Sequence, residues 1–233
     1  MDKITVVLPT YNERENISPL IEEIDEVLKT CGLIGEIIVV DDASPDGTGD
    51  IVELISRRKK NTKAIKNKKR EGLARSILAG IKASAGDTVL VMDSDGSHPP
   101  EVIPALVEGL GNADLCLASR YMPGGEMEAP RYKIELSRLL NKAIDLILGL
   151  EVKDSTGGFF AVKKDALTDI ELEDVFTGYG EYFFRLLYKL KKEGKKIESM
   201  AFRYKLRRHG KTKTNVFLMG AKYLLAAIRL RLT

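Results

Sequence analysis

The chain has 233 residues, of which 44% are hydrophobic and 30% charged, and this suits one large domain with a single substantial core. Its 37 lysines and arginines exceed its 34 aspartates and glutamates by only three charges, so overall charge does not indicate a nucleic-acid partner. The two cysteines, Cys31 and Cys116, have no metal-ligand spacing, and no apolar run reaches the roughly 18 residues that a membrane span needs.

The first 120 residues alternate short β-branched runs with helical patterns. Strands are predicted at 3–10, 36–40, 62–67, 88–93 and 113–120, and helices at 13–29, 47–60, 72–85 and 100–110. Strands alternating with helices of this length predict a Rossmann-like α/β fold, with a mainly parallel sheet flanked by helices. The runs "EIIVV" and "TVLVM" show no polar alternation, which predicts central strands buried on both faces.

The pattern changes after residue 120. A Gly/Pro-rich loop at 121–130 precedes a helix to about Leu148 and a short strand at 158–164. An amphipathic helix is predicted at 178–196, then a strand at 197–205, a basic loop at 207–215 and a final helix at 216–232. We expect all of these elements to form one domain.

Three predicted strand ends carry polar clusters, at residues 9–13, 41–48 and 93–100. Ligands of an open parallel sheet bind beyond the carboxyl ends of its strands, so these clusters are expected at one edge and in one site. Ordinary turns also explain the first two, with Asn12 capping one helix and Asp46 and Thr48 capping the next.

Asp93 and Asp95 are harder to explain as a turn, because capping needs only one side chain. Carboxylates at i and i+2 of an extended segment point to the same side and repel unless a cation lies between them. Hard oxygen ligands of this kind favour Mg²⁺ or Mn²⁺. Ser97 and His98 are candidates for a further ligand or a supporting contact, although His98 also fits a simple turn histidine.

The chain has no glycine-rich phosphate-binding loop after its first strand, which argues against nucleoside triphosphatases and dehydrogenases. Instead, five ordered segments, "VVLPTYNERENI", "IIVVDDASPDGT", "REGLARSILAGIKAS", "VMDSDGSHPPE" and "SRY", resemble the family 2 glycosyltransferases. Within that family they resemble the dolichyl-phosphate mannose synthases, and "DSTGGFF" and "RRHGKTK" extend the resemblance over nearly the whole chain.

The resemblance implies a GT-A fold and inverting transfer of mannose from GDP-mannose to dolichyl or other polyprenyl phosphate, with Mg²⁺ or Mn²⁺. It also implies a peripheral location at the cytoplasmic face of a membrane, with a small membrane-anchoring subunit as a further partner. One catalytic domain, 1–233, would comprise a nucleotide-sugar half at 1–120, an acceptor half with mobile loops at 121–213 and an amphipathic helix at 214–233.

The resemblance also assigns site residues. For the nucleoside of the donor it implies Pro9, Tyr11 and Glu13 at the base and ribose, with Asp42 beside them. For the rest of the donor it implies Asp93, Asp95 and Ser97 at the metal, Arg120 at the diphosphate and Asp154 near the sugar. The implied catalytic residues are Asp95, Arg120 and Asp154. For the acceptor phosphate it implies Arg207, Gly210, Thr212 and Lys213, with Arg131 or Lys133 in place of the family's paired basic residues. Around the second aspartate, Ser94 and Gly96 replace the family's usual Ala and Leu.

A phosphate acceptor agrees with a site that offers cations rather than a general base, because a phosphate monoester has a second pKa of about 6 and is already ionised at neutral pH.

The final helix mixes apolar and basic residues in a pattern that fits an anionic bilayer surface and, equally, a helix packed on the core. These residues are Phe217, Leu218, Leu224, Leu225, Ile228 and Leu232 with Lys222, Arg229 and Arg231. Alternative functions are a UDP-glucose-dependent polyprenyl-phosphate glucosyltransferase and a non-catalytic nucleotide-sugar-binding protein.

Overall fold

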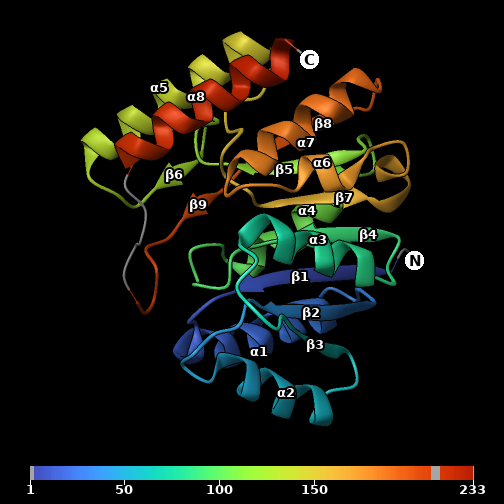
Figure 1. Cartoon of the computed structure of the whole chain (residues 1–233). Helices are drawn as coiled ribbons and strands as arrows, with labels where there is room; N and C mark the ends of the chain where they lie inside the picture. Colours follow the sequence, from blue (N-terminus) through green and yellow to red (C-terminus); the bar gives the residue numbers. More distant parts are fainter. Residues whose placement is uncertain (1–2, 211–215, 233) are drawn as a thin grey trace.

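The computed structural model describes residues 3–210 and 216–232 and is built around a seven-stranded sheet (Figure 1). In spatial order the strands are β3 (Thr62–Lys66), β2 (Gly35–Asp41), β1 (Ile4–Thr10), β4 (Thr88–Val91), β7 (Phe160–Lys163), β5 (Leu115–Ser119) and β8 (Ile197–Ala201). Only β7 among these strands runs antiparallel to its neighbours. The predicted mainly parallel sheet is therefore confirmed.

Helices cover both faces of the sheet. One face packs against α1 (Arg14–Thr30), α2 (Thr48–Arg58) and α4 (Ile103–Gly109), and the other against α3 (Leu73–Ala83), α5 (Arg131–Leu148), α7 (Glu181–Lys192) and α8 (Val216–Leu232). Alternate residues of one strand enter opposite cores: Leu90 packs on the first face and Val91 on the second. This two-sided burial explains why the β2 and β4 segments lack polar alternation.

The second half contains short elements that the sequence pattern did not predict. The expected strand at 197–205 is broken at Phe202, and its end forms β9 (Arg203–Tyr204), which pairs with β6 (Glu126–Met127) in a separate two-stranded sheet. Short helical turns η2 (Lys164–Leu167) and α6 (Leu172–Val175) were also missed, whereas η1 (Pro100–Val102) is the first turn of the helix predicted at 100–110. Elements of two to four residues are too short to produce a detectable hydrophobic period.

The final helix, α8, lies beside α5 at the end of the molecule opposite β3 and α2 (Figure 1). Its Tyr223 and Ala227 are buried, which confirms the core-packing interpretation for one side of the helix. Leu225, Ile228 and Leu232 are exposed on α8, while the side chains of Phe217 and Leu218 lie outside the described residues. Within 3–210 and 216–232, no helix combines the length and apolar character needed to cross a membrane.

Candidate functional site

The three polar strand ends meet at one edge of the sheet, as predicted. β1 lies between β2 and β4 and is parallel to both, so residues 9–13, 41–48 and 93–100 leave the sheet on the same side. Hydrogen bonds join them directly: Ser94 Oγ donates to the carbonyl of Pro9 at 2.9 Å, and the amide of Asp42 donates to the carbonyl of Thr10 at 2.9 Å. The fold thereby brings residues from three segments into one site.

Two carboxylates of this site share one arginine. Arg207 Nη1 lies 2.9 Å from Glu13 Oε1, and Arg207 Nη2 lies 2.9 Å from Asp95 Oδ2. Burial is the main cause that raises the pKa of Glu13, and the charge of Asp95 raises it further, while Asn16 and Arg207 oppose the shift. Negative charge is therefore concentrated here and is only partly compensated by the protein.

The pKa of Asp93 is also raised by its surroundings. Burial, followed by the neighbouring carboxylate of Asp95, raises the pKa of Asp93 to about 7, although Arg207 and Arg120 act in the opposite direction. The repulsion expected between carboxylates at i and i+2 is thus present. Ser97 does not face open space: its amide and hydroxyl both donate to Asp95 Oδ1, at 2.9 and 2.6 Å. Ser97 therefore orients Asp95, and its role as a ligand stays a prediction.

His98 is a buried residue, and the turn interpretation misses its role. Its side chain is fully buried and stacks on Phe159 with the ring centroids 4.6 Å apart. The amide of Asp93 donates to His98 Nδ1 at 2.9 Å, which places the ring proton on Nε2. Burial lowers the pKa of His98 to about 4, so the ring is neutral and fixes the backbone of Asp93.

Arg120 and Asp154 form a separate ion pair. Arg120 donates from Nε to Asp154 Oδ2 at 2.8 Å, from Nη2 to Oδ1 at 2.7 Å and from its amide to Oδ2 at 2.9 Å. Asp154 is fully buried and Arg120 is 9% exposed. Burial alone would lower the pKa of Arg120, but the charge of Asp154 outweighs it and raises this pKa further. The resemblance gave these residues independent roles, whereas the structure joins them.

Tyr11 and Asp42, for which the resemblance implies nucleotide contacts, pack against a neighbouring segment. The guanidinium carbon of Arg70 lies 4.1 Å from the centre of the Tyr11 ring. Asp42 accepts hydrogen bonds from the side chain of Asn67 and from the amides of Glu71 and Gly72, at 2.8 to 2.9 Å. Asp42 therefore holds the 67–72 loop against the end of β2, a contact that no local sequence signal indicates.

Neither α1 nor α2 has the predicted cap, because Glu13 and Gly47 occupy the N-cap positions without side-chain cap bonds, but Asp46 does form a turn. Asp46 Oδ1 accepts from the amide and hydroxyl of Thr48, at 3.0 and 2.6 Å, at the start of α2. Asn12 does not cap α1: Glu13 precedes the first helical residue without a side-chain cap bond, and Asn12 has the left-handed φ of 58°. The amide of Asn12 instead donates to Ser44 Oγ at 2.9 Å, linking two strand ends.

The expected acceptor residues are not all placed together. Arg131 and Lys133 are exposed on the first turn of α5, and the hydrogen bonds and ion pairs of the described residues link neither to the carboxylates. Thr212 and Lys213 lie outside the described residues. Gly210 lines a hollow of about 200 Å³ with Glu13 and Asn16, while Arg207 lies on the carboxylates themselves.

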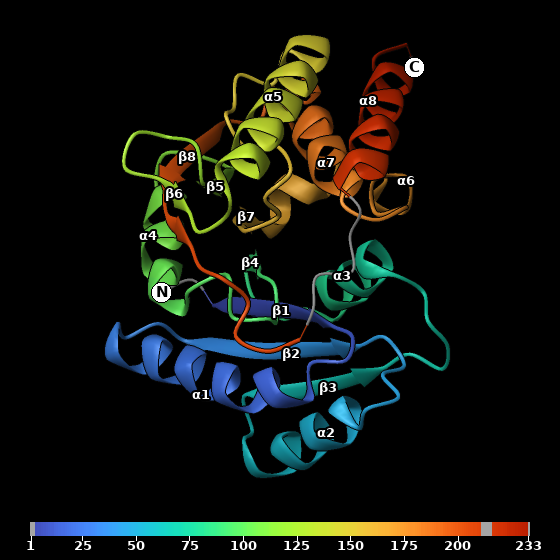
Figure 2. The same cartoon turned by 90° about the vertical axis from the view of Figure 1, so that its left-hand side faces the viewer.

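Segment 205–210 is held against the loop that carries Asp95. The amide of Lys205 donates to the carbonyl of Ser97, and the amide of Arg208 donates to the carbonyl of Asp95, both at 3.1 Å. Figure 2 shows this segment descending from β9 toward α1, and Arg208 pairs with Glu23 in the middle of that helix. Gly96 has a φ of 82°, and a Cβ there would lie 2.8 Å from the Arg208 side chain, so glycine is required for this approach.

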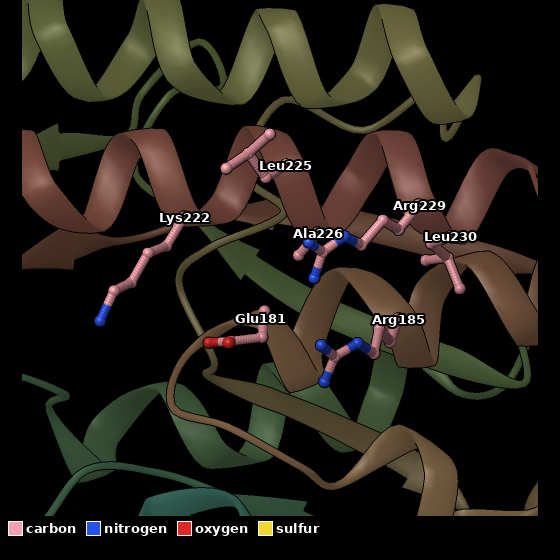
Figure 3. A pocket seen from close by; sticks show the side chains of 7 residues that line it. All are labelled: Glu181, Arg185, Lys222, Leu225, Ala226, Arg229 and Leu230. Carbon is pink, nitrogen blue, oxygen red and sulfur yellow. The ribbon is translucent and has the colours of Figure 1, made fainter.

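A larger hollow lies away from the carboxylates, between α7 and α8. Its volume is about 340 Å³, and Figure 3 shows charged side chains of both helices extending into the space between them. The lining residues are Glu181, Arg185, Lys222, Leu225, Ala226, Arg229 and Leu230. This hollow has more basic than acidic groups, in contrast to the strand-end site.

The strand-end site offers few ligands for a metal ion held by protein alone. Among the described residues, no group of three or more His, Cys, Asp or Glu side chains is arranged to hold one. Asp93 and Asp95 nevertheless fit a Mg²⁺ or Mn²⁺ ion that takes its other ligands from water and substrate phosphates. The raised pKa of Asp93, caused by burial and then by the charge of Asp95, agrees with this fit, because a bound cation would favour the ionised carboxylate.

A mainly parallel sheet with acidic residues at its carboxyl edge, between helices on both faces, agrees with the glycosyltransferase of GT-A fold that the sequence resemblance implies. Residues 5–171 match the model of the family described as "Glycosyl transferase family 2". The chain belongs to glycosyltransferase family 2.

Two curated relatives are similar over most of the chain. "Dolichol-phosphate mannosyltransferase" of Pyrococcus furiosus is 37% identical over 217 residues, which are 91% of this chain and 59% of the relative. "Undecaprenyl-phosphate mannosyltransferase" of Micrococcus luteus is 31% identical over 223 residues, 94% of this chain and 90% of the relative. The chain thus spans well under two thirds of the Pyrococcus protein and nearly all of the Micrococcus protein.

Solved structures share the fold at lower sequence identity. Glucosyl-3-phosphoglycerate synthase from Mycobacterium tuberculosis, in complex with Mn²⁺, UDP and phosphoglyceric acid, superposes with a TM-score of 0.73. It is 23% identical, and the match covers 99% of this chain and 78% of that one. The likeness confirms the GT-A fold.

Proposed function

We propose that this protein transfers mannose from GDP-mannose to a polyprenyl phosphate such as dolichyl phosphate, with inversion at the anomeric carbon. The observation that carries the proposal is the meeting of Asp93, Asp95 and Glu13 with two arginines at one edge of the sheet. The mannosyltransferase names of the relatives support the sugar and the lipid phosphate. The nucleotide follows from the sequence resemblance.

For the donor, we assign Pro9, Tyr11, Glu13 and Asp42 to the nucleoside side of the site. Asp93 and Asp95 would hold Mg²⁺ or Mn²⁺, with Ser97 orienting Asp95. The bound ion would supply a Lewis acid for the diphosphate leaving group. Arg120 would add a fixed positive charge near this position, since its charge acts on Asp93 and opposes the burial and the Asp95 charge that raise the pKa of Asp93. Asp154 keeps Arg120 oriented through two side-chain hydrogen bonds.

The acceptor side of the site needs cations rather than a base. A phosphate monoester with a second pKa of about 6 is already anionic at neutral pH and can attack without losing a proton to the protein. We assign Arg207 to this phosphate, because its guanidinium lies in the site and is 28% exposed. Lys213, Arg131 and Lys133 are further candidates, and each would act by charge and hydrogen bonding.

A lipid acceptor requires the protein to meet a membrane. α8 exposes Leu225, Ile228 and Leu232, and neighbouring α5 exposes Tyr132, Leu139 and Leu146. Basic residues accompany them, including Arg138, Lys222 and Arg229. We propose that this α5 and α8 surface lies on the cytoplasmic face of an anionic bilayer, alone or with a small membrane-anchoring subunit. The hollow between α7 and α8 adds basic groups to the same end of the molecule.

The test is transfer by the purified chain with radiolabelled GDP-mannose or UDP-glucose, dolichyl phosphate and Mn²⁺. We expect a mannosyl phospholipid from GDP-mannose and much less product from UDP-glucose. A glucosyl lipid as the main product would favour the glucosyltransferase alternative, since a protein of the same fold binds UDP with Mn²⁺. Binding of GDP-mannose without transfer to any polyprenyl phosphate would indicate the non-catalytic alternative.

A further inference from the structure

Arg207 bridges two carboxylates that the proposed function gives to the donor and its cation. The distances from its two terminal nitrogens to Glu13 Oε1 and Asp95 Oδ2 are both 2.9 Å. The side chains of Glu13 and Asp95 are only 8% and 10% exposed, so water screens them poorly. A divalent cation on Asp95 would need the same oxygen that now accepts from Arg207.

The backbone around Arg207 is fixed independently of its guanidinium. On one side the amide of Lys205 bonds to Ser97, and on the other the amide of Arg208 bonds to Asp95. The Arg208 guanidinium pairs with Glu23, at 2.7 Å from Nη2 to Oε2, rather than with the site carboxylates. The Arg207 side chain can therefore leave Asp95 by rotating, while the segment that carries it stays in place.

We propose that Arg207 occupies the position of the divalent cation on Asp95 in the ligand-free protein. When the donor and its cation bind, Arg207 is displaced from Asp95 and only then becomes available to bind the acceptor phosphate. In the ligand-free protein its guanidinium lies between Glu13 and Asp95 and places a positive charge where the divalent cation would bind. When donor and cation arrive, the displaced guanidinium stays beside the reacting centre because its backbone is anchored. This inference rests on the proposed function and adds an order to it: donor and cation bind before the acceptor.

The first test is Mn²⁺ binding to the full chain without nucleotide at pH 8, measured by electron paramagnetic resonance of free Mn²⁺. Arg207→Ala should bind Mn²⁺ at least about fivefold more tightly than the wild type, because the competitor is gone. Arg208→Ala removes the same charge from the same segment and should stay within about twofold of the wild type. Arg207→Gln, which keeps a hydrogen-bonding side chain, carries the test if the alanine variant does not fold.

The outcomes separate this inference from the proposed function. Equal or weaker Mn²⁺ binding by both Arg207 variants would overturn the inference and leave the cation site in place. An equal gain in Arg208→Ala would also overturn it, since the effect would then be general charge. No Mn²⁺ binding by any of these proteins would remove the cation site of the proposed function, and the inference with it.

The second test is the order of binding, measured with farnesyl phosphate as a water-dispersible phosphate monoester. Mn²⁺ with GDP should raise the affinity of the wild type for farnesyl phosphate at least about fivefold, since the coupling between two sites is reciprocal. The same addition should change the affinity of Arg207→Gln by less than about twofold. Wild-type affinity that is unchanged by Mn²⁺ and GDP would contradict the order that we propose.

Discussion

Two arginines serve this site, and their surroundings differ. Arg120 is 9% exposed and makes three hydrogen bonds to one fully buried carboxylate, Asp154, which forms no ion pair with any other residue of 3–210 and 216–232. Arg207 is 28% exposed and divides its guanidinium between Glu13 and Asp95, and Asp95 is itself a candidate metal ligand. The first pair is suited to fix a charge permanently, and the second to exchange partners. Breaking the buried bidentate pair would leave a charge without a partner, whereas a cation that reaches Asp95 would replace the charge that Arg207 withdraws.

Breaking the ion pair between Arg120 and Asp154 should have the largest effect, and this effect is on the stability of the fold. Asp154→Asn leaves Arg120 buried without its countercharge and should lower the free energy of unfolding by about 3–5 kcal/mol, measured by urea denaturation. The matched control is Asp169→Asn, which removes an exposed ion pair with Lys195 and should cost less than about 1 kcal/mol. Equal free energies of unfolding of Asp154→Asn and the wild type would show that Asp154 does not stabilise the fold by compensating the charge of Arg120.

Removing a proposed metal ligand should abolish chemistry with little effect on folding. We expect Asp95→Asn to lose Mn²⁺ binding and to transfer sugar at least about 100-fold more slowly, because the leaving group loses its electrostatic support. Titration of Mn²⁺ and an assay of glycolipid formation measure the two effects. Asp50→Asn, an exposed carboxylate on α2, is the control and should behave like the wild type. Retention of Mn²⁺ binding by Asp95→Asn would argue against the assignment.

Changing the surface of α8 should alter membrane binding alone. The double variant Leu225→Ser and Ile228→Ser removes two exposed apolar side chains and should bind anionic vesicles at least about tenfold more weakly. Sedimentation with phosphatidylserine-containing liposomes at low salt measures this. Leu54→Ser on α2 changes a leucine of similar exposure, 53% against 56% for Leu225, at the opposite end and should leave binding unchanged. Equal sedimentation of all three proteins would remove α8 from the proposed membrane surface.

A cluster outside the site should give the smallest effect, and only on stability. Burial would raise the pKa of Asp25, but hydrogen bonds from Lys29, Lys59 and Asn61 outweigh it and lower this pKa to about 2. A lowered pKa stabilises the fold above the unfolded-state value near 4, and this contribution is lost as the pH falls toward 2. Asp25→Asn should therefore cost about 1–2 kcal/mol at pH 7 and almost nothing near pH 2. Urea denaturation at both pH values checks this; a pH-independent difference would contradict it.

The sequence predicted the parts of this architecture that depend on local pattern. The apolar runs of β2 and β4 identified strands buried on both faces, and parallel strands with polar ends placed Asp93, Glu13 and Asp42 at one edge. The pair at i and i+2 indicated electrostatic repulsion, which the raised pKa of Asp93 reflects. These features follow from residue period and strand direction, which neighbouring residues are enough to specify.

Contacts between distant segments could not be predicted in the same way. Glu13 and Arg207 are 194 residues apart, and a basic loop carries no signal of which carboxylate it will meet. The resemblance placed Arg120 and Asp154 in one site without indicating that they pair. For His98 the sequence left a ligand, a supporting contact and a turn residue open, because its role depends on stacking with Phe159, which lies 61 residues later in the chain. Such contacts arise from packing, which the period of one segment does not encode.

The difference between the two arginines can be measured directly by nuclear magnetic resonance of the arginine Nε–Hε groups in ¹⁵N-labelled protein, with Arg207→Lys and Arg120→Lys to assign the signals. Titration with Mg²⁺ alone, which brings no diphosphate to Arg120, should shift the Arg207 signal, because its guanidinium leaves Asp95, and should leave the Arg120 signal nearly unchanged on Asp154. Bound Mg²⁺ with an unchanged Arg207 signal, or a larger change at Arg120, would contradict the account.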